Sequence, residues 1–316
     1  MTAGLTLNER AWAIADDVEK NAATLRVNVT PIGGARVLDL GVQAEGGQAA
    51  GLVLARVCLA GLAEVALVPG TLAGQLRPFV QVATDQPVLA CMASQYAGWQ
   101  VSAGKFFAMG SGPMRAAYAG EELFAHIPGK EAPPVAVGVL ESRKLPDAGA
   151  IIYLCEKLKL APEKLTLLVA PAASQAGSLQ VVARSVETAL HKLHELKFDL
   201  KQVQTGWGIA PLPPVAADEI GAIGRTNDAI LYAGRVVLWV RAEDAELERI
   251  GPQVPSSASP DHGAPFAELF ERYEHDFYKI DPKLFSPAVV VFHNLKTGRS
   301  HTFGREEPEV LARSFG

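Results

Sequence analysis

Residues 178–197 read SLQVVARSVETALHKLHELK, with apolar side chains at three- and four-residue spacing. This period predicts one long amphipathic helix. Its apolar face would carry Val182, Val186, Ala189, Leu193 and Leu196. Its opposite, polar face would carry Arg184, Glu187, His191 and His194. We expect the apolar face to pack against a core, which leaves the polar face to solvent or to a cleft.

Outward from this helix, helical and strand patterns alternate along the chain. Further helices are predicted at 8–23, 46–60, 91–96, 149–158, 215–230 and 266–277, and loops at 105–114 and 251–265. Strands are predicted at 25–29, 36–40, 64–68, 79–83, 135–140, 164–170, 233–241, 288–293 and 300–303. Because hairpins accompany the alternation, a mixed α+β fold with layered sheets is favoured over a purely parallel doubly wound sheet.

The length of 316 residues predicts two domains. Adjacent prolines interrupt regular structure, so Pro133-Pro134 is the expected hinge. We therefore expect an N-terminal α/β domain at 1–132 and a C-terminal α/β domain at 133–316. The hairpin at 288–303 could pack back on the first domain.

Composition and charge exclude several classes of protein. Hydrophobic residues make up 49% and charged residues 20%, which is typical of a globular chain with a large core. A net charge of -5 argues against a nucleic-acid binder. The most apolar stretch, 49–67, contains Arg56 and Glu64, so no membrane span is expected. The three cysteines form no Cys-x-x-Cys pair and the first ten residues do not resemble a signal peptide, so a cytoplasmic protein is expected.

Arg184 and Glu187 allow two interpretations. The simpler one is an exposed ion pair on a solvated face, which contributes little to stability. The other is a cleft in which the arginine orients the carboxylate, so that the carboxylate acts as a general base towards water. His191 and His194 have the spacing of a metal pair, but the metalloprotease glutamate and a third nearby ligand are missing. No metal site is therefore predicted, and the pattern alone leaves the role of the pair open.

Other motifs narrow the chemistry. The sequence has no Gly-x-Gly-x-x-Gly, phosphate-loop or Gly-x-Ser-x-Gly motif, so neither a nucleotide cofactor nor serine hydrolysis is indicated. Trp99 could stack on a flat heteroaromatic ring or pack in the core. The segment 172–178 offers a serine cap and a close backbone approach before the long helix. Four basic residues beside Gly, aromatic or Asn neighbours are expected to be ordinary surface cations: Lys105, Arg115, Arg225 and Lys279.

Seven stretches in order along the chain together resemble methenyltetrahydromethanopterin cyclohydrolase. They are VCLAGLAEV at 57–65, SQYAGWQ at 94–100, KFFAMGSGP at 105–113, GSLQVVARSVET at 177–188, GRTNDAILY at 224–232, PSSAS at 255–259 and DFYKIDP at 276–282. Each is modest alone, but the set spans essentially the whole chain. The modest charge looks more like the bacterial, methylotroph-type branch than the acidic archaeal one.

The resemblance implies two α/β-type domains with a large pocket between them, and a homotrimer. It implies reversible hydrolysis of 5,10-methenyltetrahydromethanopterin to the N5-formyl compound in one-carbon metabolism, with formaldehyde oxidation as the setting in methylotrophs. The pterin is the substrate, and no cofactor is required. The catalytic Arg and Glu of the family fall on Arg184 and Glu187. Matching loops suggest as substrate contacts Ser94, Trp99, Lys105, Glu141, Ser174, Arg225 and Asn227.

Two other functions remain open at the level of sequence. One is a metal-dependent amidohydrolase that uses His191 and His194. The other is a non-catalytic pterin-binding protein.

Overall fold

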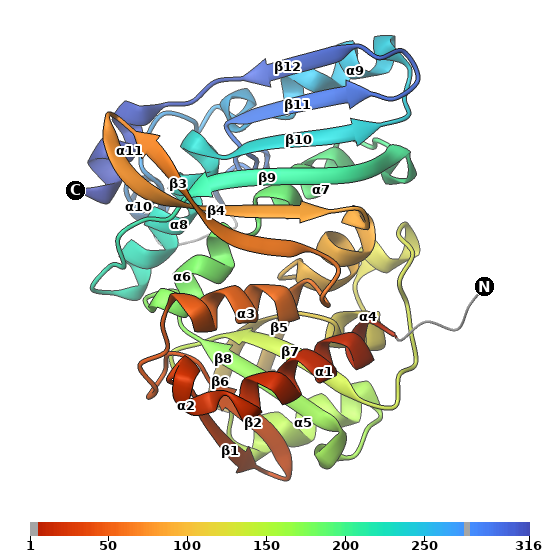
Figure 1. Ribbon diagram of the computed structural model, residues 1–316, viewed down its shortest axis with the longest axis vertical. Helices are drawn as coiled ribbons and strands as arrows, with labels where there is room; N and C mark the ends of the chain where they lie inside the picture. Colours follow the sequence, from red (N-terminus) through yellow and green to blue (C-terminus); the bar gives the residue numbers. More distant parts are fainter. Residues whose placement is uncertain (1–5, 275–278) are drawn as a thin grey trace. The chain divides into compact units, whose positions relative to one another are not determined.

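A computed structural model describes residues 6–274 and 279–316. The chain divides into two compact units, each an assembly of one mixed sheet and helices. The first unit takes residues 1–63 and 89–180, and the second takes 64–88 and 181–316 (Figure 1). The predicted α+β class is confirmed. The expected boundary at 132/133 does not coincide with this division, because Pro133-Pro134 lies inside the first unit.

The first unit contains a six-stranded sheet with the order β1-β2-β8-β7-β6-β5. Its strands are β1 (Asn28–Ile32), β2 (Ala35–Asp39), β5 (Trp99–Ala103), β6 (Phe106–Ser111), β7 (Ala136–Glu141) and β8 (Leu165–Ala170). Strands β2, β8 and β7 are parallel, whereas β1 and β6 run antiparallel to their neighbours. Buried strands of this kind are mostly apolar, and β8 is buried along its whole length with Thr166 as its one polar residue.

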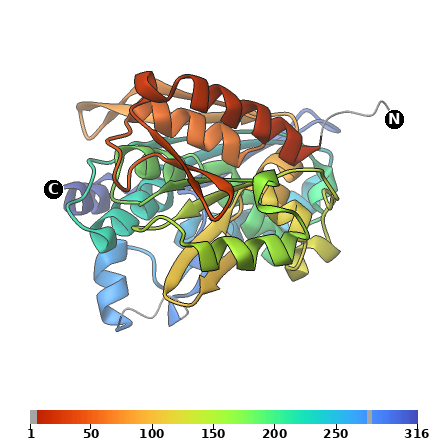
Figure 2. The same cartoon turned by 90° about the horizontal axis from the view of Figure 1, so that it is seen from below.

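Helices cover both faces of this sheet. The α1 helix (Leu7–Lys20) and α3 (Gln48–Cys58) lie side by side on one face, and α5 (Ala148–Leu158) lies on the other (Figure 2). Alternate residues of β8 therefore enter different cores, with Leu167 facing α5 and Leu168 facing α1 and α3. The remaining elements are α2 (Ala22–Leu25), a π-helix at Val88–Gln95, α4 (Met114–Tyr118), short 3-10 turns and α6 (Gln175–Val182).

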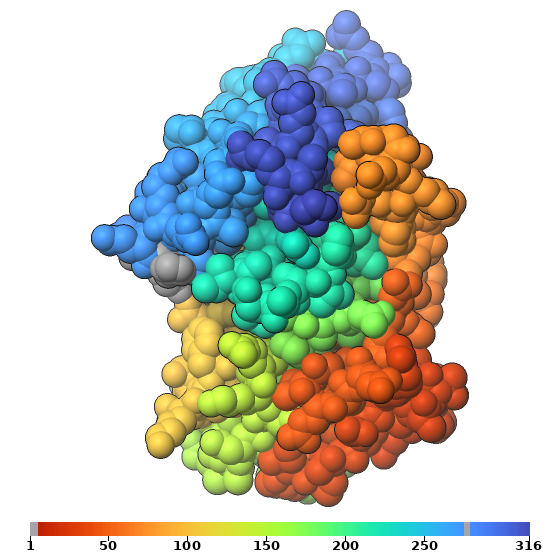
Figure 3. All heavy atoms as spheres, turned by 90° about the vertical axis from the view of Figure 1, so that its left-hand side faces the viewer, coloured from red at the N-terminus to blue at the C-terminus, as the bar shows by residue number. Residues whose placement is uncertain are grey.

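The second unit contains a six-stranded sheet with the order β12-β11-β10-β9-β4-β3. Its strands are β3 (Glu64–Leu72), β4 (Gln75–Thr84), β9 (Val203–Pro211), β10 (Arg235–Val240), β11 (Val289–Asn294) and β12 (Ser300–Gly304). Its helices are α7 (Ser185–Glu195), α8 (Glu219–Ala233), α9 (Asp244–Ile250), α10 (Phe266–Arg272) and α11 (Pro308–Phe315). The C-terminal helix α11 lies against α8 (Figure 3).

Several expectations about single elements need correction. The final hairpin, expected to pack back on the domain at 1–132, pairs with β10 in the sheet that also contains β3 and β4. The expected loop at 105–114 is half of a hairpin, because β5 and β6 turn at Gly104, whose φ of +59° suits glycine. Strand β9 had no sequence prediction, since Gly206 and Gly208 weaken the strand pattern. Part of the helix expected at 266–277 lies outside the described residues, and α10 ends at Arg272.

The expectation about membranes concerned the stretch 49–67. Within the described residues, no helix is long and apolar enough to cross a bilayer.

Candidate active site

The predicted helix at 178–197 is two helices, and the break between them positions Arg184. Helix α6 ends at Val182 and α7 begins at Ser185. Arg184 stands at the N-cap of α7, with φ -89° and ψ 8°. Its N–H donates to the carbonyl of Val181 at 3.1 Å, and its carbonyl accepts from Thr188 N at 2.9 Å. The Arg184 side chain therefore projects from a bend between two helices and not from the face of one helix.

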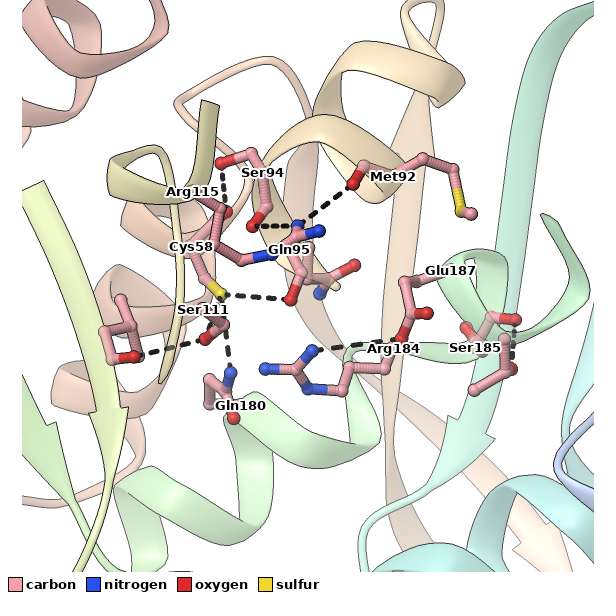
Figure 4. A network of polar contacts seen from close by, with 12 residues as sticks. Cys58, Met92, Ser94, Gln95, Ser111, Arg115, Gln180, Arg184, Ser185 and Glu187 are labelled. Atoms are coloured by element: carbon pink, nitrogen blue, oxygen red, sulfur yellow. Dashed lines mark hydrogen bonds and ion pairs between the residues drawn. The ribbon is translucent and has the colours of Figure 1, made fainter. Parts of the chain in front are cut away.

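The side chains of Arg184 and Glu187 meet at this bend (Figure 4). Arg184 Nη1 lies 3.8 Å from Glu187 Oε2, and the two side chains are 9% and 6% exposed. The interpretation as a solvated surface pair is therefore wrong. A buried charge is costly unless it is paired, so this pair is under much stronger constraint than an exposed one. Glu187 also lies in the first turn of α7, where the helix dipole favours negative charge.

The rest of α7 follows the predicted apolar face. Val186, Ala189 and Leu193 are fully buried. Lys192, which breaks the pattern, is also buried, and its ammonium group donates to the carbonyl of Lys283. Burial lowers the pKa of Lys192 to about 8. The amphipathic pattern thus identified the packing face correctly but not the interruption at Arg184.

The two histidines of α7 are partly buried. His194 Nδ1 lies 3.8 Å from Glu195 Oε1, its neighbour in sequence. Among residues 6–274 and 279–316, no group of three or more His, Cys, Asp or Glu side chains is arranged to hold a metal ion. The structure therefore gives the metal-dependent alternative no additional support.

Ser94, a predicted substrate contact, lies in the first unit near the end of the π-helix. Its hydroxyl donates to the carbonyl of Cys58 at 2.6 Å. Its own carbonyl accepts from Gly112 N at 2.9 Å and from Arg115 Nη1 at 3.2 Å. Ser94 is fully buried, and these bonds hold the π-helix to its neighbours.

Arg115 was expected at the surface, and that expectation is wrong. Its side chain is fully buried and forms a bidentate pair with Glu121, with Nε to Oε1 at 2.7 Å and Nη2 to Oε2 at 2.5 Å. A third bond runs from Nη1 to the carbonyl of Met92 at 3.0 Å. The fork of five N–H donors makes arginine suited to such multiple pairing. Nothing in the local sequence distinguished Arg115 from an exposed cation.

A second buried polar group surrounds the thiol of Cys58 in the first unit (Figure 4). Gln180 Nε2 and Ser111 Oγ each lie 3.4 Å from the Cys58 sulfur. The Ser111 hydroxyl also lies 3.3 Å from the carbonyl of Val139. Gln180 is not among the predicted site residues, although a glutamine within the apolar run of α6 was a usable signal.

Trp99 lies in the core of the first unit. Its ring stacks on Tyr118, with centroids 4.2 Å apart and planes inclined by 19°, and it is 4% exposed. Of the two roles left open by the sequence, core packing accounts for this arrangement. We therefore remove Trp99 from the proposed pterin contacts.

Glu141 and Ser174 lie at the carboxyl edge of the parallel strands of the first unit. Glu141 ends β7, opposite Ala170 at the end of β8, and Ser174 follows that strand. The Ser174 hydroxyl accepts from Gly177 N at 3.0 Å, so it caps α6, as the sequence suggested for this segment. Ligands of α/β sheets bind at such edges, which makes these two residues the best placed of the predicted contacts in this unit.

The other predicted contacts have different surroundings. Lys105 is exposed at the turn between β5 and β6. Arg225 donates to the carbonyls of Ser314 and Pro214, which fastens α8 to α11 and to a loop. Asn227 donates to Ile223 O at 2.8 Å within its own helix. Among the predicted site residues, Arg184 and Glu187 contact each other.

Known proteins resemble this chain over nearly its full length. A family model described as "Cyclohydrolase (MCH)" matches residues 6–315. A protein of Rhodopirellula baltica named methenyltetrahydromethanopterin cyclohydrolase is 51% identical, over 98% of this chain and 95% of its own length. Proteins with the same name from Methylobacterium sp. (strain 4-46) and Methanococcoides burtonii are 45% and 40% identical, each over at least 97% of both chains. The chain therefore belongs to the MCH cyclohydrolase family.

Proposed function

We propose that this chain hydrolyses 5,10-methenyltetrahydromethanopterin reversibly to the N5-formyl compound. The relatives that carry this activity in their names match the chain over nearly its full length. The observation that carries the proposal is the buried Arg184–Glu187 pair at the break between α6 and α7. A carboxylate held in a buried position by one arginine is suited to remove a proton from water.

The first step is attack of water on the methenyl carbon. This carbon lies between two nitrogens of a cationic ring, so it is electrophilic without a metal ion or a nicotinamide. The water oxygen forms a bond to the carbon while Glu187 takes one proton from the water. The product of this step is a neutral carbinol that bridges N5 and N10.

The second step opens the ring. Protonated Glu187 returns its proton to N10 as the bond between carbon and N10 breaks. The carbinol hydroxyl loses its proton to solvent and becomes the formyl carbonyl on N5. Overall one water is consumed and one proton is released, and Glu187 ends in its starting state.

Arg184 orients the carboxylate and keeps its charge paired before and after the reaction. A carboxylate near a cationic substrate also strengthens binding, but only interactions that are stronger in the transition state raise turnover. We therefore assign the gain in rate to the position of Glu187 relative to the water, and assign Arg184 to holding that position.

The test is the decay of methenyltetrahydromethanopterin absorbance with the wild-type protein and with Glu187→Gln. We expect Glu187→Gln to lose about 10²–10⁴-fold in kcat, because proton transfer by a placed side chain contributes this much. Its KM should rise, because the negative charge that attracts the cationic substrate is gone, but by a smaller factor than kcat falls. Near-normal turnover in this variant would remove Glu187 from the role of base, and binding without turnover by the wild-type protein would favour a pterin-binding protein.

We propose that the pterin contacts Glu141 and Ser174, because both lie at the carboxyl edge of the parallel strands. The other proposed contacts are Lys105, Ser94, Arg225 and Asn227. Glu141→Gln should raise KM more than it lowers kcat if the carboxylate binds the pterin. A change confined to kcat would instead place Glu141 in the chemistry.

The remaining properties are also proposals. We propose that the enzyme needs no cofactor or metal, works in the cytoplasm and forms a homotrimer, and that methylotrophic one-carbon metabolism is its setting. Activity that survives exhaustive dialysis against a chelator supports the first, whereas loss and restoration by one metal contradicts it. Light scattering on a sizing column should give three times the mass of the chain.

A further inference from the structure

The sheet of the second unit carries a narrow depression on β9, which we call the glycine trough and define by Gly206 and Gly208. Both residues are buried, and Ala210 continues the same face. Gly208 is flanked by Val82 on β4 and Val236 on β10, and Gly206 by Thr84 and Leu238. Directly opposed residues of neighbouring strands share a face, so two glycines lie between two rows of larger side chains.

The first turn of α7 occupies this trough. A Cβ on Gly208 would lie 2.4 Å from Ser185 Oγ and 2.9 Å from Val186 Cγ2. A Cβ on Gly206 would lie 2.7 Å from Val186 Cγ1. Side chains in ordinary contact are about 3.5–4.0 Å apart, so a methyl group in the trough would force α7 or its side chains to move.

The side chain of Ser185 packs against the glycine trough at Gly208. Its hydroxyl is fully buried and has no hydrogen-bond partner within the described parts of the chain. Its carbonyl accepts from Thr188 Oγ1 at 2.9 Å, which belongs to the first turn of the helix. The contact between Ser185 and Gly208 is therefore one of shape.

We propose that Gly208, supported by Gly206, is a positioning residue for the proposed cyclohydrolase reaction. Ser185 directly follows Arg184 and lies two residues before Glu187. The distance at which Ser185 packs against β9 therefore determines where both catalytic side chains lie. A misplacement of about 1 Å at a catalytic group can cost about 10²-fold in rate. This inference rests on the proposed function, because it deepens the role of the Arg184–Glu187 pair.

The test is Gly208→Ala, assayed by methenyltetrahydromethanopterin absorbance. We expect kcat to fall by about 10- to 100-fold while KM changes by less than threefold, because the substrate contacts are elsewhere and the geometry of the base is lost. The double variant Gly208→Ala/Ser185→Ala removes the atom at 2.4 Å. The contact with Val186 Cγ2 at 2.9 Å remains, so the double variant should recover part of the lost kcat, at least about threefold over Gly208→Ala.

A matched control overpacks the same sheet elsewhere. Gly251→Ala would place its Cβ 2.1 Å from the ring of Phe303 on β12, three strands away from β9. We expect Gly251→Ala to lose stability as Gly208→Ala does and to keep kcat within about twofold, since overpacking in itself destabilises. A similar fall in kcat in both variants would overturn the proposal.

A second readout does not depend on turnover. The amide of Thr188 donates to Arg184 O at 2.9 Å, so its hydrogen exchange reports the closure of the first turn of α7. It should exchange faster in Gly208→Ala and return towards the wild-type rate in the double variant. If Gly208→Ala does not fold, Ser185→Cys applies a milder push on the same contact through its longer bond to sulfur, and should show the same signs.

The outcomes separate the two proposals. A wild-type protein without cyclohydrolase activity contradicts the proposed function, while the exchange of Thr188 still decides whether the trough seats α7. An active wild-type protein with unchanged kcat and unchanged exchange in Gly208→Ala overturns the positioning role alone. A loss that the double variant does not relieve has the same consequence.

Discussion

Burial of a single ion pair separates this site from an ordinary helical surface. Arg184 and Glu187 stand three residues apart, a spacing that surface helices use often and that contributes little there. Their side chains are 9% and 6% exposed, so both charges of the pair are held away from solvent. At the residue scale, the consequence is that removing one partner differs greatly from removing both.

This dependence can be measured through the free energy of unfolding. We expect Arg184→Ala to lower it by about 3–5 kcal/mol, because it removes the cation of a buried ion pair and leaves the charge of the Glu187 carboxylate in place. Arg184→Ala/Glu187→Gln should be more stable than Arg184→Ala, since the buried negative charge is gone as well. Urea unfolding of the two variants checks this, and equal stabilities would mean that the carboxylate has sufficient other partners.

Asp228 is a second buried carboxylate, and its neighbours hold α8 to other parts of the second unit. Phe266 N donates to Oδ1 at 2.9 Å and Ser314 Oγ donates to Oδ2 at 2.6 Å. Burial raises the pKa of Asp228 to about 7, against the effect of these bonds. The folded chain therefore keeps this carboxyl group protonated at pH values below about 7.

The sign of the pH dependence follows from this pKa. The unfolded chain releases the Asp228 proton near pH 4 and the folded chain near pH 7. The stabilisation from the retained proton is complete below about pH 4 and is lost as the pH rises to about 7, on the order of 4 kcal/mol in all. Asp228→Asn carries no such proton, so its stability relative to wild type should rise over this range. Chemical unfolding at several pH values tests this, and a constant difference from pH 4.5 to 8 contradicts it.

At the scale of elements, small residues decide how closely helices and strands approach. The β5–β6 hairpin needs Gly104 at its turn, and β9 needs Gly206 and Gly208 beneath α7. Trp99 acts through its size instead: its ring stacks on Tyr118, the last residue of α4, and so anchors β5. A large ring in a core contributes through buried area and stacking.

This role of Trp99 leads to a prediction about stability and binding. Trp99→Phe should lower the free energy of unfolding by about 1–3 kcal/mol, because it shrinks a close-packed core residue. The KM for methenyltetrahydromethanopterin should stay within about twofold. A large rise in KM with unchanged stability would return Trp99 to the pterin contacts.

At the scale of the whole molecule, both units are built from separated segments. Strand β2 of the first unit pairs in parallel with β8, which lies more than 120 residues further along the chain. Strands β3 and β4 belong to the sheet of the second unit, although they lie within the first 84 residues. Parallel pairing requires a crossover, and here the crossover contains part of the other unit.

A cut at the expected hinge should therefore destroy both units. The fragment 1–132 lacks β7 and β8, and the fragment 133–316 lacks β3 and β4. We expect neither fragment alone to show a cooperative unfolding transition by circular dichroism, whereas the full chain does. A sharp transition in the fragment 1–132 would contradict the division seen here.

The sequence by itself determined the α+β class, most elements and the family resemblance, and it selected Arg184 and Glu187 as candidate site residues. These follow from local period, turn chemistry and short motifs. Tertiary structure alone decided the break of the helix at Arg184 and the burial of the pair. It also decided that Trp99 packs in the core and that Arg115 is buried and paired with Glu121. It also decided the make-up of the units, because strand partners far apart in sequence leave no local pattern. The physical reason is the same in each case: burial and pairing depend on what the rest of the chain brings to a residue, which its neighbours in sequence do not specify.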